Sequence, residues 1–323
     1  MAYSAGDTIL DDEYNNFLNG SSGGAYGINH IMGTGSGVYG LGQSTVSTVS
    51  AGDTINASQW NSLFTAMDNV ANHTNISISS TSAKSAGDAV AIISALNTDL
   101  QSLAAAVAGG STGVTAISTG SELQSSTSST RWTGSHTVEH SVTFGSANNL
   151  RFFFNAGGKI RFSFTRNGNG GGSATSKDSS VDELISAMGS FDMGSTTSTR
   201  SGSGETVTTN GLSLGAADLT TSYQTLLRLT QSSGTYTSMF IDVQAKINAS
   251  YGSGTVITMR YQISDPDSGD SEFTSGNTSS VDQYANFVGQ TDMSTRLRLP
   301  TTAQGLSTVY TLSGSAVVSN STS

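Results

Sequence analysis

The residues best placed to do chemistry are two histidines and a glutamate in the stretch His136-Thr137-Val138-Glu139-His140. Their spacing fits the inverted zinc-protease pattern H-x-x-E-H, in which two histidines one helical turn apart hold a metal ion. The surrounding residues alternate with period two and are rich in valine and threonine, which predicts a strand. On a strand the two histidines lie about 13 Å apart, at about 3.3 Å per residue. One zinc ion cannot bind both, because each Zn–N bond is only about 2.1 Å long, so we expect no metal site here.

A second candidate is the acidic run Asp265-Pro266-Asp267-Ser268-Gly269-Asp270, which resembles a fragment of a calcium-binding loop. Gly269 stands where a third oxygen donor is needed, and no bidentate glutamate follows at the distance of an EF-hand. We interpret the run as a solvated turn between strands. Calcium binding stays open if other loops contribute oxygen ligands.

Other searches for reactive groups give little. Residues 166–177 are glycine-rich and contain a lysine, but the P-loop spacing is absent, and no G-x-S-x-G elbow occurs. The 23 carboxylates leave room for a glycosidase pair, yet no pattern marks one out. His30 and His73 lie in Gly- and Asn-rich surroundings and are expected in turns or on the surface. The sequence therefore predicts no catalytic, cofactor-binding or metal-binding residue, and no enzyme.

The composition explains which elements could position such groups. Of the 323 residues, 35% are hydrophobic and 11% are charged, against typical values of about 45–50% and about 25%. Glycine, serine and threonine replace them, which suits short strands and tight turns around thin cores. The 12 Phe, 10 Tyr and 2 Trp argue against disorder. Thin cores favour completion by oligomerisation.

Charge and cysteine content exclude several classes of protein. The formal net charge is −10, which disfavours binding to nucleic acid. The chain has no cysteine, so disulfides and thiolate metal sites are excluded. We find no signal-peptide pattern and no apolar run long enough to insert into a membrane, so synthesis in the cytoplasm is expected.

A short phrase occurs twice, as SAGDTILDDEYNNFL at residues 4–18 and as SAGDTINASQWNSLF at residues 50–64. Both copies predict a turn, a buried isoleucine, a helix start and an apolar helix face, and Asn56 with Gln59 has capping-box spacing. Asp11 and Asp12 of the first copy become Ala57 and Ser58 in the second, which indicates a packing unit and not an active site. The predicted packing and docking residues are Tyr14, Phe17, Leu18, Trp60, Leu63 and Phe64.

A weaker third echo, Ser85-Ala86-Gly87-Asp88, precedes a predicted helix that ends near Ala108. This helix carries an apolar stripe with spacings of 3 and 4 at Ile93, Leu96, Leu100, Leu103 and Val107. One interpretation is a parallel oligomer seam, most naturally trimeric. The other is a helix that packs on the first two helices within one subunit.

The second half of the chain predicts strands. Alternating runs occur at residues 136–144, 224–230, 237–248, 255–264, 295–299 and 307–318, and residues 150–164 predict a hairpin that turns at residues 155–158. One short helix is expected at residues 180–188. The predicted fold class is therefore α+β: a small repeated helical module and a linking helix, followed by a β-rich, antiparallel, sandwich-like domain.

The expected domains are a docking module at residues 1–80, an oligomerising or packing helix at residues 81–108, a linker at residues 109–130 and a β-rich domain with one short helix at residues 131–323. The linker prediction rests on the low apolar content and the lack of a period in that stretch.

The string GVYGLGQSTVSTVSAGDTINASQWNSLF, residues 37–64, resembles a pattern of virion structural proteins in tailed bacteriophages, marine phages especially. The matching positions are Tyr39, Gly40, Gln43, Val49, Gly52, Ile55, Gln59, Trp60 and Asn61. Residues 152–164 and 178–191 resemble a further element of these proteins, although the tryptophan expected within residues 178–191 is missing. The first repeat also departs from the pattern, with Tyr14 in the tryptophan position. The resemblance implies an oligomeric structural role in the virion without catalysis.

The sequence leads to one main hypothesis and two alternatives. The main hypothesis is a trimeric tail fibre or other tail or baseplate-attached fibre protein, which binds other virion proteins and contacts a host surface glycan or protein. Residues 167–176 and 265–275 would form the contacting loops. The alternatives are a capsid cement or decoration protein and, third, a tailspike glycan depolymerase.

Overall fold

The chain folds into two units, which are described separately here. A computed structural model describes residues 11–20, 26–88, 93–109, 118–127, 135–166, 176–234, 236–264, 266, 291–299 and 319–322. The helical unit comprises residues 1–118, 146–158 and 299–311, and the β unit comprises residues 119–145, 159–298 and 312–323. Helices and antiparallel sheets are both present, so the predicted α+β class is confirmed.

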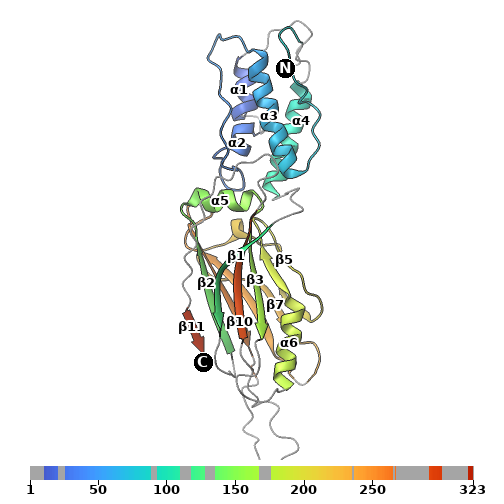
Figure 1. Ribbon diagram of the computed structural model, residues 1–323, viewed down its shortest axis with the longest axis vertical. Helices are drawn as coiled ribbons and strands as arrows, with labels where there is room; N and C mark the ends of the chain where they lie inside the picture. The colour runs from blue at the N-terminus through green and yellow to red at the C-terminus, as the bar shows by residue number, and fades with distance from the viewer. Residues whose placement is uncertain are drawn as a thin grey trace, which may run out of the picture. The chain divides into compact units, whose positions relative to one another are not determined.

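In its described residues, the helical unit contains four helices from the N-terminal part of the chain and one from the middle (Figure 1). These helices are α1 (Asp11–Asn19), α2 (Ile28–Met32), α3 (Ala57–Thr74), α4 (Ile93–Ala108) and α5 (Ala147–Asn155). Helices α1, α2 and α4 contact one another, and α3 contacts α2 and α4. Their apolar faces meet in one continuous core, to which Ala156 after α5 also belongs. None of the helices in the described ranges is long and apolar enough to cross a membrane.

Helix α5 corrects the hairpin that was predicted at residues 150–164. Ser146 caps this helix, because its side-chain oxygen accepts a hydrogen bond from the Asn149 amide at 3.1 Å. The three consecutive phenylalanines that follow, residues 152–154, do not alternate with polar residues, so they carry no strand period. Alternation begins only in β3 (Lys159–Arg166), where Ile160, Phe162 and Phe164 are buried.

The β unit consists of two sheets. The five-stranded sheet has the order β1-β10-β3-β4-β5, and the six-stranded sheet has the order β11-β2-β9-β8-β7-β6. The strands of the first are β1 (Ser118–Thr127), β10 (Thr291–Leu299), β3, β4 (Ser190–Met193) and β5 (Ser198–Arg200). Those of the second are β11 (Ser319–Thr322), β2 (Ser135–Thr143), β9 (Val256–Ser264), β8 (Phe240–Ile247), β7 (Gln224–Thr230) and β6 (Thr206–Asn210).

Aromatic side chains join the two sheets face to face. Tyr261 of β9 lies against Phe162 and Phe164 of β3, with ring centroids 4.7 and 5.2 Å apart. Helix α6 (Ser176–Met188) contacts β3 of one sheet and β7 and β8 of the other (Figure 1). It buries Val181, Leu184 and Met188. The short helix predicted at residues 180–188 is therefore confirmed, and it belongs to the core of the sandwich.

Most of the predicted strands are present, but the predicted linker needs correction. Residues 118–127, inside the expected linker at 109–130, form β1 beside β10. Their polar side chains gave no apolar alternation, so the sequence pattern could not indicate this strand. The short strands β4, β5 and β6 were not predicted either. The strand expected at residues 307–318 lies outside the described residues.

Candidate functional site

The six predicted packing residues lie together in the core of the helical unit. Tyr14 and Trp60, which occupy equivalent repeat positions, meet edge to face with ring centroids 5.3 Å apart. Phe17 and Phe64 lie against the same indole at 6.1 and 5.9 Å. The Tyr14 hydroxyl also donates a hydrogen bond to the backbone oxygen of Gln59 at 2.9 Å. The two copies of the repeat thus pack their aromatic anchors against each other.

The stripe on α4 fills the same core and does not form a surface seam. Leu96, Leu100, Leu103 and Val107 are at most 1% exposed within the single chain, and Ile93 is partly buried against them. These side chains cannot reach a second subunit while the helical unit is folded. The prediction of an oligomer seam is therefore wrong, and the alternative interpretation, packing within one subunit, is correct.

Helix α3 begins with the capping box that the spacing of Asn56 and Gln59 predicted. The Asn56 side chain accepts a hydrogen bond from the Gln59 amide at 3.1 Å, and the Gln59 side chain accepts one from the Asn56 amide at 2.8 Å. This capping box satisfies backbone donors that a helix start would otherwise leave unpaired. It places Trp60 in the first turn of the helix, facing the core.

The repeated Ser-Ala-Gly-Asp phrase is a closed turn in which the aspartate is structural. The Asp53 amide donates to the Ser50 carbonyl oxygen at 3.0 Å, and the Asp53 carboxylate accepts from the Ser50 amide at 3.0 Å. The third echo has the same pair of contacts between Ser85 and Asp88, at 3.1 and 2.7 Å. The third residue of each turn has a φ of +87° or +94°, a conformation that favours glycine.

Asparagine side chains hold the segments that lead into these turns. Asn15 of α1 donates to the Val49 carbonyl oxygen at 2.9 Å and accepts from the Val49 amide at 3.0 Å. Asn61 of α3 makes the same two contacts with Lys84, at 2.9 and 2.8 Å. Asn15 and Asn61 occupy the same repeat position, and each binds the residue directly before the next Ser-Ala-Gly-Asp turn. We call this arrangement an asparagine clamp.

Asn29 of α2 forms a further asparagine clamp on Val46, with hydrogen bonds of 2.9 and 2.8 Å. No local pattern in the sequence indicated a role for any of these asparagines. The available signal was the identity of Asn15 and Asn61 in the two copies of the repeat. Asn29 lies outside the repeat, so nothing in the sequence pattern could indicate it.

Helix α5 holds the glycine-rich turn at residues 33–40. Arg151, only 3% exposed, donates to the carbonyl oxygens of Tyr39 at 2.6 Å and Thr34 at 2.7 Å. The Asn155 amide donates to the carbonyl oxygens of Tyr39 at 2.9 Å and Gly40 at 3.1 Å. Gly40 has a φ of +93°, and a Cβ atom there would lie 2.2 Å from the Thr34 carbonyl oxygen. This explains the glycine at position 40 of the motif at residues 37–64.

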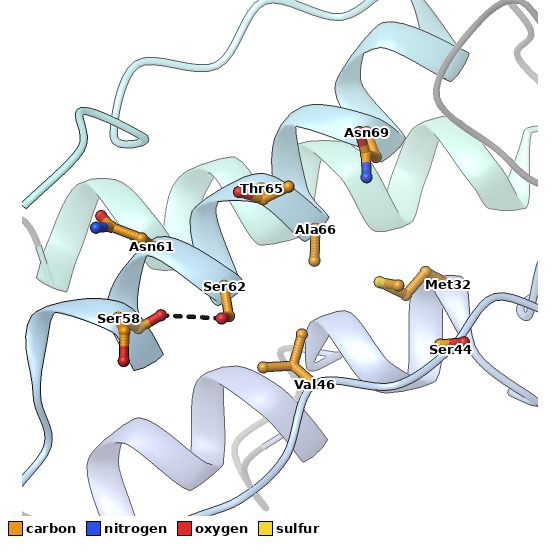
Figure 2. A pocket seen from close by; sticks show the side chains of 9 residues that line it. All are labelled: Met32, Ser44, Val46, Ser58, Asn61, Ser62, Thr65, Ala66 and Asn69. Carbon is orange, nitrogen blue, oxygen red and sulfur yellow. Dashed lines mark hydrogen bonds between the residues drawn. The ribbon is translucent and has the colours of Figure 1, made fainter.

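A groove with a volume of about 450 Å³ runs along α3 on the helical unit (Figure 2). Met32, Ser44 and Val46 line one side of it, and α3 lines the other. The α3 residues that line it are Ser58, Asn61, Ser62, Thr65, Ala66 and Asn69. All nine lining side chains are uncharged, so the groove offers hydroxyl and amide groups beside the apolar side chains of Met32, Val46 and Ala66.

His73 lies in the core and not on the surface, where it was expected. It is 1% exposed near the end of α3, and neither ring nitrogen has a hydrogen-bond partner in the described part of the chain. Burial lowers the pKa of His73 to about 4, because the charged imidazolium would lose its hydration. His30, beside Tyr26 and Tyr39, is partly exposed, with its pKa lowered by burial and by the charge of Arg151.

The H-x-x-E-H stretch forms a strand, as its alternation predicted. On β2, His136 and His140 are buried on the inner face, whereas Glu139 lies on the outer face. Glu139 accepts a hydrogen bond from Arg260 at 2.7 Å. Burial acts to raise the pKa of Glu139, but Tyr223 and the charged Arg260 and Lys246 together lower it. The strand therefore separates the glutamate from the histidines. No group of three or more metal-ligating side chains gathers in the ranges that the structure describes.

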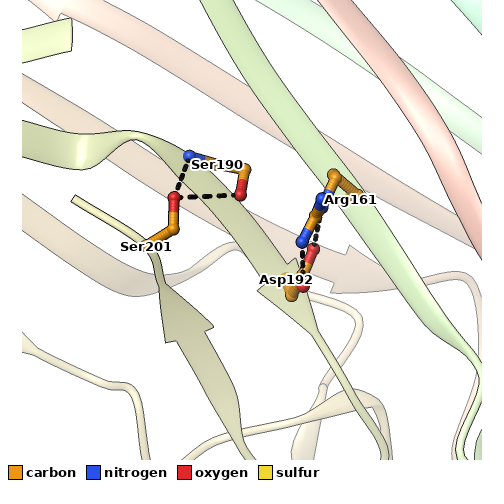
Figure 3. A network of polar contacts seen from close by, with 4 residues as sticks. All are labelled: Arg161, Ser190, Asp192 and Ser201. Carbon is orange, nitrogen blue, oxygen red and sulfur yellow. Dashed lines mark hydrogen bonds and ion pairs between the residues drawn. The ribbon is translucent and has the colours of Figure 1, made fainter. Parts of the chain in front are cut away.

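Polar side chains of the five-stranded sheet pair with one another (Figure 3). Arg161 of β3 donates two hydrogen bonds to Asp192 of β4, at 2.6 and 2.7 Å. Ser201, which follows β5, accepts a hydrogen bond from the Ser190 amide at 2.9 Å. These contacts tie β3, β4 and the end of β5 together. They are cross-strand structural contacts.

The loops expected to contact a host and the acidic run at residues 265–270 lie outside the described residues, apart from Ser176 and Pro266. Comparison with known protein families, with curated proteins and with solved structures finds no match. The function is therefore argued from the residues and their geometry.

Proposed function

We propose that this chain is a structural subunit of a tailed bacteriophage virion, a homo-oligomeric fibre or fibre-like appendage of the tail, without catalytic activity. The observation that carries the proposal is the clamped helical unit. The stretch that resembles phage virion proteins, residues 37–64, coincides with the clamped turns, the capping box and the Trp60 anchor.

The roles of the polar residues support a structural function. The aspartates of the repeat close turns, the asparagines clamp backbone, and Arg151 binds carbonyl oxygens of the glycine-rich turn. Each of these groups acts on the chain itself. Such a unit suits a docking module that must keep its shape, with the β unit as the part that faces outward.

The homo-oligomer rests on composition, because thin Gly-, Ser- and Thr-rich cores gain stability from association. The trimer expected from the stripe on α4 loses its basis, because that stripe is buried within one chain. The proposal therefore includes an oligomer but no fixed number of subunits. Its interface must use another surface.

The test is to locate the protein in purified phage particles. Antibodies raised against the β unit should label the tail in electron micrographs, and mass spectrometry should detect the chain in particles purified free of unassembled protein. Labelling on the head would instead support a capsid cement protein. Absence from the particles would refute the proposal. New reducing ends after incubation with host polysaccharide would support the depolymerase alternative.

A further inference from the structure

The groove along α3 has a chemistry that fits polypeptide backbone. Its walls carry hydroxyl and amide groups, which can both donate and accept hydrogen bonds, beside the apolar side chains of Met32, Val46 and Ala66. The nine lining side chains include no charged group, so the groove offers no cation to a phosphate or carboxylate ligand. An uncharged ligand with alternating donors and acceptors fits this surface.

The helical unit already binds extended backbone in one recurring way. The clamps of Asn15, Asn29 and Asn61 each use one amide to bind both the N–H and the C=O group of a single residue. Each clamped segment lies outside helices and strands. The same contact thus occurs three times in this unit, on three different helices.

Asn69 offers a fourth asparagine of this kind, directed at the groove. It lies eight residues after Asn61 on α3, about 12 Å further along the helix axis at 1.5 Å per residue. It is half-buried and makes no hydrogen bond to the described residues. Its amide lines the groove together with Ser62 and Thr65 (Figure 2).

We propose that the groove binds an extended segment of a second copy of this chain, and that Asn69 clamps its backbone as Asn61 clamps Lys84. The segment lies between α3 and the stretch from Ser44 to Val46. Its side chains are uncharged, because the lining offers no ionic partner, and Met32, Val46 and Ala66 provide an apolar surface on which they pack.

A second copy fits for two reasons. First, only 11% of the residues of this chain are charged, and 38 of its 323 residues are glycine. The chain therefore offers many segments of the required kind. Second, the segments that the three known clamps hold belong to this same sequence. The inference rests on the proposed homo-oligomer and assigns it an interface, in place of the buried stripe on α4.

Sedimentation velocity over a concentration series tests the interface with two groove variants and one matched control. Asn69→Arg and Ser62→Arg place a long cation in the groove, whereas Asn72→Arg changes an exposed residue of the same helix outside it. We expect the first two to weaken self-association at least tenfold and Asn72→Arg to leave it unchanged. Circular dichroism spectra and melting temperatures equal to the wild type show that all three fold.

Thiol labelling gives a second measurement, because the chain has no cysteine of its own. Ser62→Cys should react more slowly with a maleimide as the protein concentration rises through the range of association. Asn72→Cys should react at a constant rate. A Ser62→Cys thiol that stays fully reactive in the oligomer means that the groove belongs to another partner, which overturns the proposal.

The remaining outcomes are equally decisive. A wild-type protein that sediments as a monomer at every concentration overturns the proposal, as does equal association of Asn69→Arg and Asn72→Arg. These results do not touch the location of the protein in the particle. Detection in the virion together with a monomer in solution would remove the groove interface and keep the structural role.

Discussion

The two units satisfy their backbone polar groups in different ways. In the β unit, strand amides and carbonyls bond to each other along ladders, as in β2 and β9, which pair from Ser135 opposite Ser264 to Thr143 opposite Val256. In the helical unit, the described segments between helices run beside no strand, and asparagine side chains bind their backbone instead. Buried backbone groups need partners in either case, and on these segments of the helical unit asparagine side chains take the place of a neighbouring strand.

This difference decides what polar side chains do in each unit. The ladders of the β unit leave side chains free to pair across strands, as Arg161 does with Asp192 and Arg228 with Asp242. In the helical unit the corresponding groups are committed to backbone. The helical unit should therefore depend on single polar side chains, whereas the β unit should tolerate their loss.

The loss of Trp60 should have the largest effect on stability. It should destabilise the helical unit and leave the β unit folded. Trp60→Ala removes the ring that Tyr14, Phe17 and Phe64 share, at a cost of about 3–5 kcal/mol. Hydrogen exchange measured by mass spectrometry should show lost protection in α3 peptides and retained protection in β9 peptides. Tyr26→Ala, at an exposed aromatic residue, serves as the control. Equal loss of protection in β9 would mean that the units unfold together.

The second-largest expected effect is a loss of stability of the helical unit in acid. His73 has a pKa of about 4 when folded, against 6.5 for an unperturbed histidine, so the unfolded chain binds an extra proton between these pH values. Stability is therefore fully present above pH 6.5 and falls as the pH drops towards 4, by about 3 kcal/mol in total. Below both pKa values this contribution stays lost.

His73→Leu should remove this pH dependence from the helical unit. Trp132→Phe leaves Trp60 as the only tryptophan, so its fluorescence reports urea unfolding of the helical unit at each pH. The loss of stability between pH 6.5 and 4 should be smaller by about 3 kcal/mol than in the parent. An unchanged pH profile would show that His73 is hydrated or hydrogen-bonded in solution.

The sequence predicted the anchors of the helical unit because they follow helical spacing. Trp60, Leu63 and Phe64 recur at the positions of Tyr14, Phe17 and Leu18, and all six are buried together. Spacing alone could not tell a subunit core from an oligomer seam, since an apolar stripe is required in both cases. Only the folded chain shows that the other helices cover the stripe on α4.

The sequence failed where contacts join distant parts of the chain. Arg151 and Asn155 bind the turn around Tyr39, more than 110 residues earlier in the sequence, and no local pattern reports such a contact. The run of phenylalanines at residues 152–154 looked like strand because aromatic residues favour sheets. The capping serine at position 146 was the local signal for a helix.

Removal of one asparagine clamp should lower the free energy of unfolding of the helical unit by less than the changes at Trp60 and His73. The loss should still be large for a partly exposed side chain. Asn61→Ala leaves the N–H and C=O groups of Lys84 without their partners and should cost about 1–3 kcal/mol. Asn72→Ala, at an exposed asparagine of the same helix, should stay within about 0.5 kcal/mol. Urea unfolding followed by Trp60 fluorescence measures both.

Asn61→Asp sharpens the result, because aspartate can still accept from the Lys84 amide but cannot donate to its carbonyl oxygen. It should retain part of the stability that alanine loses. Equal stability of Asn61→Ala and Asn72→Ala would show that water replaces the clamp, and the contrast between the two units would then fail.

The smallest effect should come from an ion pair on the outer face of the six-stranded sheet. Arg260 binds Glu139 at 2.6 Å, with side chains 37% and 27% exposed. Exposed pairs of this kind contribute about 0–1 kcal/mol and weaken with salt. A double-mutant cycle with Glu139→Gln and Arg260→Gln, followed by urea unfolding of the β unit, measures the coupling.

Because the ladder between β2 and β9 already satisfies the backbone, the coupling should stay below about 1 kcal/mol and fall with added salt. A coupling above about 2 kcal/mol, beyond the range of exposed pairs, would show that the β unit depends on single polar side chains as the helical unit does.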